Sequence, residues 1–329
     1  MISAPHKLCV APMMERTDRH CRFLLRLFSP NAWLYTEMIT AEALARGDRG
    51  QLLRFHPSEH PVALQLGGGD VELLAKAARW GATAGYDEIN LNVGCPSDRV
   101  QAGEFGAALM AMPKKVAAAV IAINEVVDVP VTVKTRLGID KQDSYIFLKK
   151  FVAIVSKAGC RSIMIHARKA WLNGLSPKEN REIPPLDYQR VYEIKDEFPE
   201  LEIVINGGLD TLSKCLAQLT LVDGVMLGRC VYHNPSFLGK LDARIFGDDD
   251  LNSSPDDVFQ AFLDYMADEM GRGTPLRAMA RHLMGLYFGQ PGVKRWRRFL
   301  GELPNDTKGL KALSQFRGKD FFLTPPKEE

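Results

Sequence analysis

The segment NVGCPSDR, residues 92–99, places a thiol between a glycine and a proline, directly after the alternating apolar run EINLNV. The glycine permits a tight turn and the proline limits its freedom, so Cys95 is expected to be held in a fixed position. A thiol held in this way can act as a nucleophile, a metal ligand or a proton donor. The six cysteines of the chain are widely scattered and form no C-x-x-C pair, so we expect neither a disulfide nor a metal site.

Other side chains that could take part in binding or catalysis lie at the ends of other short apolar runs. An inward-pointing Lys134 can form a Schiff base or stabilise negative charge on a reduced flavin, and His166 ends a similar run. Gln65 suits an amide contact to the edge of a heterocycle, and Met13 and Met14 offer polarisable apolar surface to a planar ring. Together these residues favour a flavin over an aldolase-type Schiff base. The alternative is that Lys134 is an edge lysine and His166 a core histidine.

These residues must be positioned by strands, and eight short β-rich runs recur along the chain: 8–13, 32–38, 61–67, 88–93, 130–135, 162–167, 202–208 and 224–229. Between them lie stretches with helical periodicity, such as 70–86, which Asp70 opens as an N-cap, and 113–127. Eight such units predict an α/β fold, a (β/α)8 TIM barrel, over residues 1–247. The carboxyl ends of its strands then form one rim, which is where an active site is expected.

The last two strand ends carry glycines. Asn206, Gly207 and Gly208 end the seventh run, and Gly228 and Arg229 end the eighth. Barrels commonly bind phosphate at these two loops, where glycine lets backbone N–H groups approach an oxygen. Arg229 adds a charged donor, so we expect a phosphate site that suits a phosphosugar, a flavin mononucleotide or pyridoxal phosphate.

The alternation of strands and helices stops at DDDLNSSPDD, residues 248–257, which we interpret as a linker. Residues 258–329 have no strand signal and contain four amphipathic helical segments, which predict a small C-terminal helical domain. Between Arg272 and Lys319 there are four Lys and seven Arg but only two acids, although the whole chain has a net charge of only +2. Such an excess is either a solvated helical face or a surface for a polyanion.

Composition narrows the class of protein. The chain has 46% hydrophobic and 25% charged residues, as globular proteins do. We find no secretion signal at its start and no uninterrupted apolar stretch long enough to span a membrane. We therefore expect a cytoplasmic protein.

Several segments resemble the flavin-dependent tRNA-dihydrouridine synthases: APMMERTDRHCR, NLNVGCPSDRVQAGEFGAALM, VTVKTRLGID, INGG and VMLGR. The stretch HARKAWLNGLSPKENREIPPL, residues 166–186, resembles the A subfamily in particular, and the resemblance spans the whole chain. It implies reduction of the 5,6 double bond of uridines 20 and 20a in the tRNA D-loop, with FMN as hydride carrier and NADPH as its reductant. It also implies tRNA as the partner. We expect no membrane association and no obligate protein partner.

The resemblance assigns a role to each candidate. It implies that Pro12, Met13 and Met14 lie beside the FMN ring, that Gln65 and Lys134 meet its polar edge with His166 nearby, and that the phosphate meets Asn206, Gly207, Gly208, Gly228 and Arg229. Cys95 takes the place of the proton donor. A thiol suits this role because it is mostly protonated at neutral pH.

By the same resemblance, Asn92 holds the uracil base or its backbone beside the thiol. Lys178 and Arg181 in the long loop after the sixth run, and Lys294 and Arg297 in the basic tail, are expected to contact tRNA. The two residues of each pair are three positions apart in the sequence. The alternative is that each pair is an ordinary solvated surface pair that binds nothing.

Two other functions remain open. A different FMN barrel, such as a dihydroorotate-type dehydrogenase of a small molecule, shares a phosphate site and a loop cysteine, but it needs neither the basic tail nor the long loop. A tRNA-binding protein without chemistry needs neither the thiol nor the complete flavin site.

Overall fold

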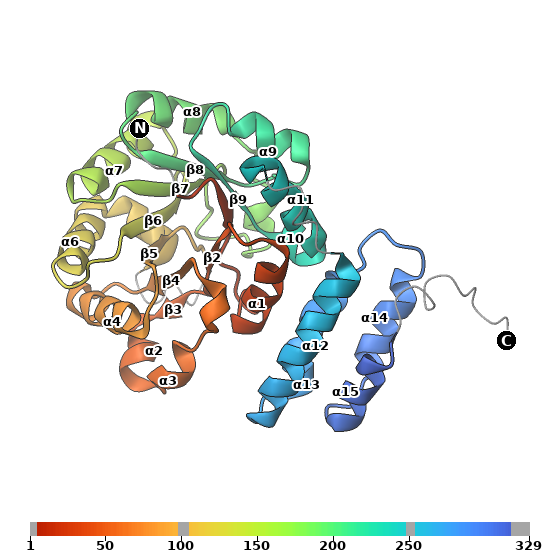
Figure 1. Cartoon of the computed structure of the whole chain (residues 1–329). Coiled ribbons are helices and arrows are strands. Elements are labelled where there is room, and N and C mark those ends of the chain that lie inside the picture. The colour runs from red at the N-terminus through yellow and green to blue at the C-terminus, as the bar shows by residue number, and fades with distance from the viewer. Residues whose placement is uncertain (1–4, 98–104, 248–253, 317–329) are drawn as a thin grey trace. The chain divides into compact units, whose positions relative to one another are not determined.

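Eight parallel strands close into a barrel, which lies inside a ring of helices (Figure 1). The computed structural model describes residues 5–97, 105–247 and 254–316. The strands are β1 (Leu8–Val10), β2 (Trp33–Tyr35), β4 (Val62–Gly67), β5 (Glu88–Val93), β6 (Val131–Arg136), β7 (Ser162–His166), β8 (Glu202–Asn206) and β9 (Gly224–Leu227). Pairing of β1 with β9 and of β2 with β4 closes the ring, and the two-residue β3 (Ile39–Thr40) pairs with β4 beside it. The predicted TIM barrel is confirmed.

Helices surround these strands (Figure 1). They are α2 (Ala41–Arg46), α3 (Arg49–Leu52), α4 (Val71–Ala84), α6 (Pro113–Asn124), α7 (Tyr145–Lys157), α8 (Tyr188–Glu197) and α9 (Leu212–Gln218). Their starts follow the sequence closely: the Asp70 carboxylate accepts the N–H of Leu73, and Ser144 caps α7 in the same way. Because helices cover the outer face of the strands, both faces of each strand are buried, which is why strands such as β1 (LCV) and β9 (GVML) read as continuous apolar runs.

The barrel interior is divided by chemical character. Its apolar part is a cluster from β1, β2, β4 and β7–β9: Cys9, Ala11, Tyr35, Ala63, Met164, Val204 and Met226. Its polar part comes from β4, β5 and β6, where Gln65, Asn90 and Thr132 are paired across neighbouring strands in register. The polar side chains therefore form a row of direct neighbours.

The chain divides into two compact units, Met1–Thr17 with Ala32–Gly228, and Asp18–Asn31 with Arg229–Glu329. This division differs from the expected boundary at 247, because α1 (Arg19–Phe28), α10 (Arg229–His233) and α11 (Pro235–Phe246) group with the C-terminal helices. The apolar face of α1 explains its place, since Phe23 stacks on Tyr265 with 3.9 Å between ring centroids. Helical periodicity alone does not show which core a helix joins.

The second unit also contains α12 (Pro255–Gly271), α13 (Leu276–Ala280), α14 (Val293–Glu302) and α15 (Thr307–Ser314), with the 3-10 turn Arg281–Gly285 after α13. Their shared core includes Phe262, Met266, Leu283 and Trp296. The helix α12 starts inside the expected linker 248–257, of which residues 248–253 lie outside the described residues. Within the described ranges, no helix combines the length and apolar character that crossing a membrane requires.

Candidate active site

The strand ends of the barrel bring five of the predicted site residues to one rim. Asn92 on β5 is the register partner of Lys134 on β6, and His166 on β7 is the partner of Asn206 on β8. The Asn92 amide Nδ2 donates to Gln65 Oε1 at 2.8 Å, and Lys134 Nζ donates to Asn206 Oδ1 at 3.1 Å. Residues from five consecutive parallel strands thus meet, as the barrel geometry requires.

The Cys95 loop is anchored by backbone and side-chain hydrogen bonds. Asn92 Oδ1 accepts the N–H of Gly94 at 3.2 Å and that of Cys95 at 3.0 Å. The N–H of Ala107 donates to the Cys95 carbonyl at 2.9 Å. The half-buried thiol donates to Ser97 Oγ at 3.5 Å, measured from Sγ. The thiol is therefore fixed in direction while part of it stays accessible.

Gly94 does not contribute what the sequence suggested. Its φ is not positive, and a Cβ there would lie no closer than 3.4 Å to its neighbours, which is ordinary contact. The turn owes its shape instead to the Asn92 side chain and to the ring of Pro96. The prediction that this turn depends on glycine's conformational freedom was wrong.

Arg136 is a further residue of this rim. Its Nε donates to the Gly94 carbonyl at 2.9 Å, and its Nη1 donates to the carbonyls of Lys169 and Asn180 at 3.1 and 2.9 Å. It joins the Cys95 loop to the long loop after β7. Its position two residues after Lys134, on the same face of β6, was the sequence signal for it.

The long loop after β7 is organised by Asn180, which is fully buried. Asn180 Nδ2 donates to the carbonyls of Trp171 and Leu175, and its Oδ1 accepts the N–H of Trp171 at 2.7 Å. Lys178 and Arg181 lie on either side of it and are exposed. Asn180 was not predicted, because only the folded loop shows that its amide closes the loop.

The rim is electropositive. Burial, with help from Arg136, lowers the pKa of Lys134 to about 7. Burial also holds the pKa of His166 well below its ordinary value, and the neighbouring cations Arg136, Lys134, Arg168 and Arg181 add to this effect. The buried Nδ1 of His166 has no hydrogen-bond partner among the described residues. A buried nitrogen without a hydrogen-bond partner, surrounded by cations, suits the binding of an anionic or acceptor-rich ligand.

The loop after β8 forms a glycine cradle. Gly207 and Gly208 have φ of +114° and +69°, a region that favours glycine. A Cβ on Gly208 would lie 2.5 Å from Leu186 Cδ1 and 2.8 Å from the Tyr188 hydroxyl. A Cβ on Gly228 would meet only ordinary contacts, with Met13 Sδ at 3.7 Å and Ala11 Cβ at 3.9 Å, so packing alone does not require glycine there.

The remaining predicted residues lie on the β1 loop and in the second unit. Pro12 and Met13 are half-buried, whereas Met14 is 56% exposed. Thr17 Oγ1 accepts the N–H of Met13 at 2.9 Å and so holds this loop. Arg229 is exposed as the first residue of α10.

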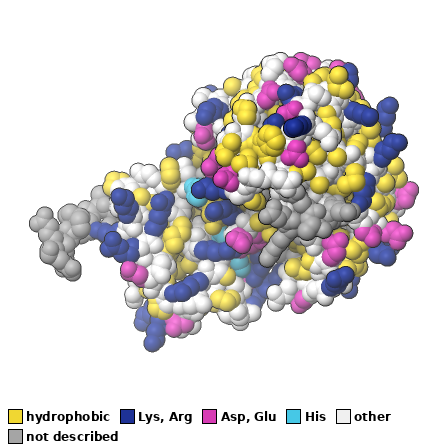
Figure 2. All heavy atoms as spheres, turned by 180° about the vertical axis from the view of Figure 1, so that it is seen from behind, with side chains coloured by type: hydrophobic (Ala, Val, Ile, Leu, Met, Phe, Trp, Pro, Cys, Tyr) yellow, Lys and Arg dark blue, Asp and Glu magenta, His cyan; other side chains and the backbone are white. Residues whose placement is uncertain are grey.

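The predicted tRNA contacts of the tail lie on α14. Lys294 and Arg297 are exposed on this helix, whereas Trp296 and Leu300 are buried in the core of the second unit. Figure 2 shows more Lys and Arg than acidic side chains on the left part of the face in view. The face of α14 that carries Lys294 and Arg297 is therefore available to a polyanion.

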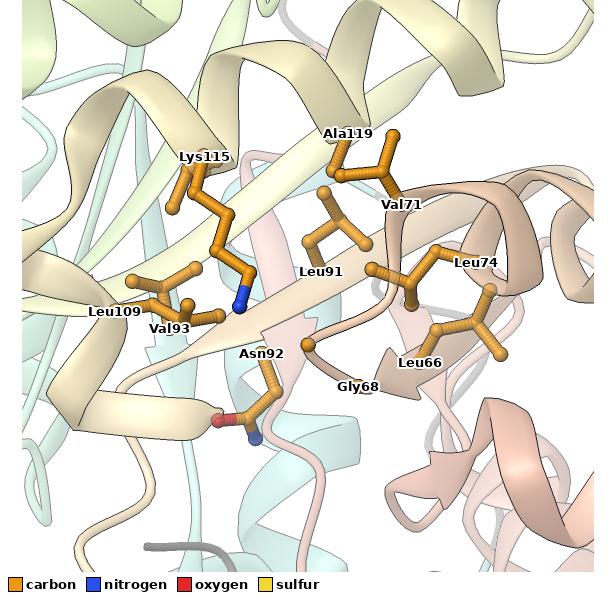
Figure 3. Close-up of a pocket in the computed structure, with 12 residues that line it drawn as sticks. Leu66, Gly68, Val71, Leu74, Leu91, Asn92, Val93, Leu109, Lys115 and Ala119 are labelled. Carbon is orange, nitrogen blue, oxygen red and sulfur yellow. The ribbon is translucent and has the colours of Figure 1, made fainter. Parts of the chain in front are cut away.

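A hollow on the outer side of β5 does not belong to this site. Apolar side chains from β4, β5, α4 and α6 line it together with Lys115 and with Asn92, whose amide points away from the apolar side chains (Figure 3). Its volume of about 10 Å³ holds at most about one water molecule. It is a packing gap behind the strand, whereas the polar rim lies at the strand ends.

A family model and curated relatives show the family of this chain. The family model described as "Dihydrouridine synthase (Dus)" matches residues 9–320. A protein of Escherichia coli (strain K12) named tRNA-dihydrouridine(20/20a) synthase is 54% identical over 297 residues, covering 90% of this chain and 86% of its own. A protein of the same name from Vibrio parahaemolyticus is 52% identical and covers 98% of both chains.

A solved structure supports the fold. An old yellow enzyme homologue from Zymomonas mobilis superposes with a TM-score of 0.54 at 14% sequence identity, covering 75% of this chain and 90% of its own. At that identity the likeness concerns the fold alone.

Proposed function

This chain belongs to the dihydrouridine synthase family, and on that premise we propose that it reduces uridine to 5,6-dihydrouridine in the D-loop of tRNA, at positions 20 and 20a. Relatives that are 52–54% identical over most of their length are named tRNA-dihydrouridine(20/20a) synthase. The observation that carries the proposal is the half-buried Cys95 thiol at the same rim as Lys134, His166 and Asn206 and beside the cation Arg136.

We infer that this rim holds FMN. The unsatisfied Nδ1 of His166 fits an acceptor or donor edge of the isoalloxazine ring, as do Gln65 and Lys134. The cradle of Gly207 and Gly208 fits a phosphate. Asn206, Gly228 and Arg229 would complete the phosphate site, and Pro12, Met13 and Met14 would lie beside the ring. FMN, reduced by NADPH, supplies the hydride when it is bound.

Cys95 would complete the reduction. Hydride delivery to carbon 6 of uracil leaves enolate-like charge that is resolved when carbon 5 takes up a proton. The backbone of Cys95 is held by Asn92 and by the Ala107 N–H, so its thiol can be aimed at one atom of a bound base. The remaining N–H of the Asn92 amide is available to the base.

The uridine must leave its stack to reach this rim. Lys178 and Arg181 are exposed on the loop that Asn180 closes, and Arg181 acts electrostatically on His166 and Arg136. We propose that the side chains of Lys178 and Arg181, together with those of Lys294 and Arg297 on α14, bind the tRNA phosphates.

The decisive experiment incubates the purified protein with FMN, NADPH and unmodified tRNA and maps dihydrouridine by position. We expect dihydrouridine at positions 20 and 20a and a yellow protein with flavin absorbance. A yellow protein that leaves the tRNA unchanged but oxidises dihydroorotate would favour the small-molecule dehydrogenase. A colourless protein that binds tRNA would favour a binding function without chemistry.

A further inference from the structure

A continuous row of hydrogen-bonded side chains passes through the barrel interior, starting at the strand end opposite the rim. There the His6 imidazole lies between two carboxylates, with Nε2 2.5 Å from Glu88 Oε2 and Nδ1 2.7 Å from Glu202 Oε2. All three side chains are buried, with at most 5% exposed. A buried carboxylate needs such partners, because an isolated one is costly to desolvate.

The row continues from Glu88 toward the rim. Thr132 Oγ1 donates to Glu88 Oε1 at 2.5 Å, and Asn90 Nδ2 donates to Thr132 Oγ1 at 2.8 Å. Gln65 Nε2 then donates to Asn90 Oδ1 at 2.7 Å. These three residues are direct register partners on β4, β5 and β6, so the strand pairing itself keeps them in reach.

The last two links reach the Cys95 loop. Asn92 Nδ2 donates to Gln65 Oε1 at 2.8 Å, and Asn92 Oδ1 accepts the backbone N–H groups of Gly94 and Cys95. Every member of the row is therefore bonded to the next, from the His6 imidazole to the loop that carries the thiol.

The row has a direction that is set at both ends, by the Glu88 carboxylate at one end and by the backbone N–H groups of Gly94 and Cys95, which can only donate, at the other. A carboxylate accepts hydrogen bonds and does not donate, so Thr132 must give its single hydroxyl proton to Glu88. The Thr132 oxygen can then only accept, which turns the Asn90 NH2 group toward it and the Asn90 carbonyl toward Gln65. The same reasoning turns the Gln65 carbonyl toward Asn92, and the Asn92 carbonyl toward the loop.

We propose that Thr132 and Asn90 are positioning residues, which transmit the orientation imposed by Glu88 to the side-chain amides of Gln65 and Asn92. They thereby fix both the polar edge of the cofactor site and the Cys95 loop. The cofactor part of this inference rests on the proposed function, and the loop part does not. Filling space does not require such a row, because the other side of the same interior is filled with Met164, Val204 and Met226.

The test compares two substitutions of one residue with a matched control. Thr132→Val keeps the shape of the side chain but removes the hydroxyl, whereas Thr132→Ser keeps the hydroxyl. Ser162→Ala is the control. Ser162 donates to Glu202 at the same end of the barrel, so this substitution removes a hydrogen bond that lies outside the row from Glu88 to Asn92. The thermal stability of each full-length variant is measured first.

The first readout needs no cofactor. Amide hydrogen exchange of Gly94 and Cys95 is followed by NMR in the FMN-free protein, relative to amides in β8. We expect Thr132→Val to accelerate exchange of these two amides about tenfold, and Thr132→Ser and Ser162→Ala to leave the ratio within about twofold.

The second readout is the FMN dissociation constant from flavin fluorescence. We expect it to rise about tenfold in Thr132→Val and to stay near the wild-type value in the other two variants. Unchanged exchange and unchanged FMN affinity in a folded Thr132→Val protein would overturn the inference, and so would equal changes in all three variants. A wild-type protein that does not bind FMN would instead contradict the proposed function, and the exchange result would still decide the role of the row. If Thr132→Val does not fold, Asn90→Ser interrupts the same row, and the same outcomes apply.

Discussion

At the scale of the residue, the position of Cys95 is fixed mainly by hydrogen bonds from neighbouring residues. Its backbone is held by Asn92 and Ala107, and the neighbouring Gly94 carbonyl is held by Arg136. Its thiol makes a single weak contact, to Ser97 Oγ, among the described residues. A group that is fixed through its backbone and lightly bonded at its sulfur can give up a proton without rebuilding its surroundings.

Replacement of Cys95 by alanine tests this role. We expect Cys95→Ala to oxidise NADPH through the flavin at a normal rate but to form dihydrouridine roughly 10²–10⁴-fold more slowly. Single-turnover reduction of tRNA by the pre-reduced protein measures this step directly. Cys230→Ala, which removes a half-buried thiol from the second unit, is the control. Product formation at the normal rate in Cys95→Ala would rule out the proton-donor role.

At the scale of the element, the loops after β8 and β9 use glycine for different reasons. Gly208 needs its positive φ and has no room for a Cβ, whereas Gly228 has neither restriction. We expect Gly208→Ala to lower the free energy of unfolding by at least about 1 kcal/mol. Gly228→Ala should change it by less than about 0.5 kcal/mol and yet weaken FMN binding, because the methyl group would lie where we propose that the phosphate binds. Denaturant unfolding and FMN titration of both variants separate the two effects, and normal FMN binding by Gly228→Ala would place the phosphate elsewhere.

The amino ends of β5 and β8, together with the residues before β1, are joined by the ion pairs of His6. Burial alone would lower the pKa of His6, but Glu88 and Glu202 outweigh it and raise the pKa to about 10. The folded protein therefore holds this proton more tightly than the unfolded chain, in which the pKa is about 6.5. The resulting stabilisation is complete below pH 6.5 and disappears as the pH rises toward 10.

Replacement of His6 by glutamine should remove this stabilisation. We expect His6→Gln to lose roughly 3–5 kcal/mol of the free energy of unfolding at pH 6, because two buried carboxylates then lack their cation. The difference from the wild type should shrink steadily between pH 7 and pH 10. Urea unfolding across this range measures it, and a difference that does not depend on pH would show that His6 is not protonated in the folded protein.

At the scale of the whole molecule, positive charge is concentrated in two places, at the barrel rim and in the second unit. The rim residues Lys134 and Arg136 are largely buried, and we propose that they act on a small ligand. Lys294 and Arg297 are exposed on α14 and can act on a large polyanion. The two groups should therefore be separable by mutation.

The double substitution Lys294→Gln and Arg297→Gln tests that separation. We expect it to weaken tRNA binding and to reduce the slope of log affinity against log salt by about two, while FMN affinity is unchanged. Lys76→Gln with Arg79→Gln is the matched control, since these residues have the same types and spacing on the exposed face of α4. An equal loss of tRNA affinity in both double variants would argue for general charge attraction rather than a tRNA site on α14.

The sequence by itself determined the barrel, its strand ends and most of the residues at its rim. Alternation, N-caps such as Asp70 and glycines such as Gly208 act over a few residues, and their physical effects are local. Only the tertiary structure decided that α1 joins the C-terminal helices, that Asn180 closes the long loop, and that His6, Glu88, Thr132 and Asn90 are linked to the Cys95 loop. Those features depend on which side chains become neighbours through strand register and helix packing. His6 and Glu202 lie far apart in the chain, and they can form an ion pair only when the barrel closes.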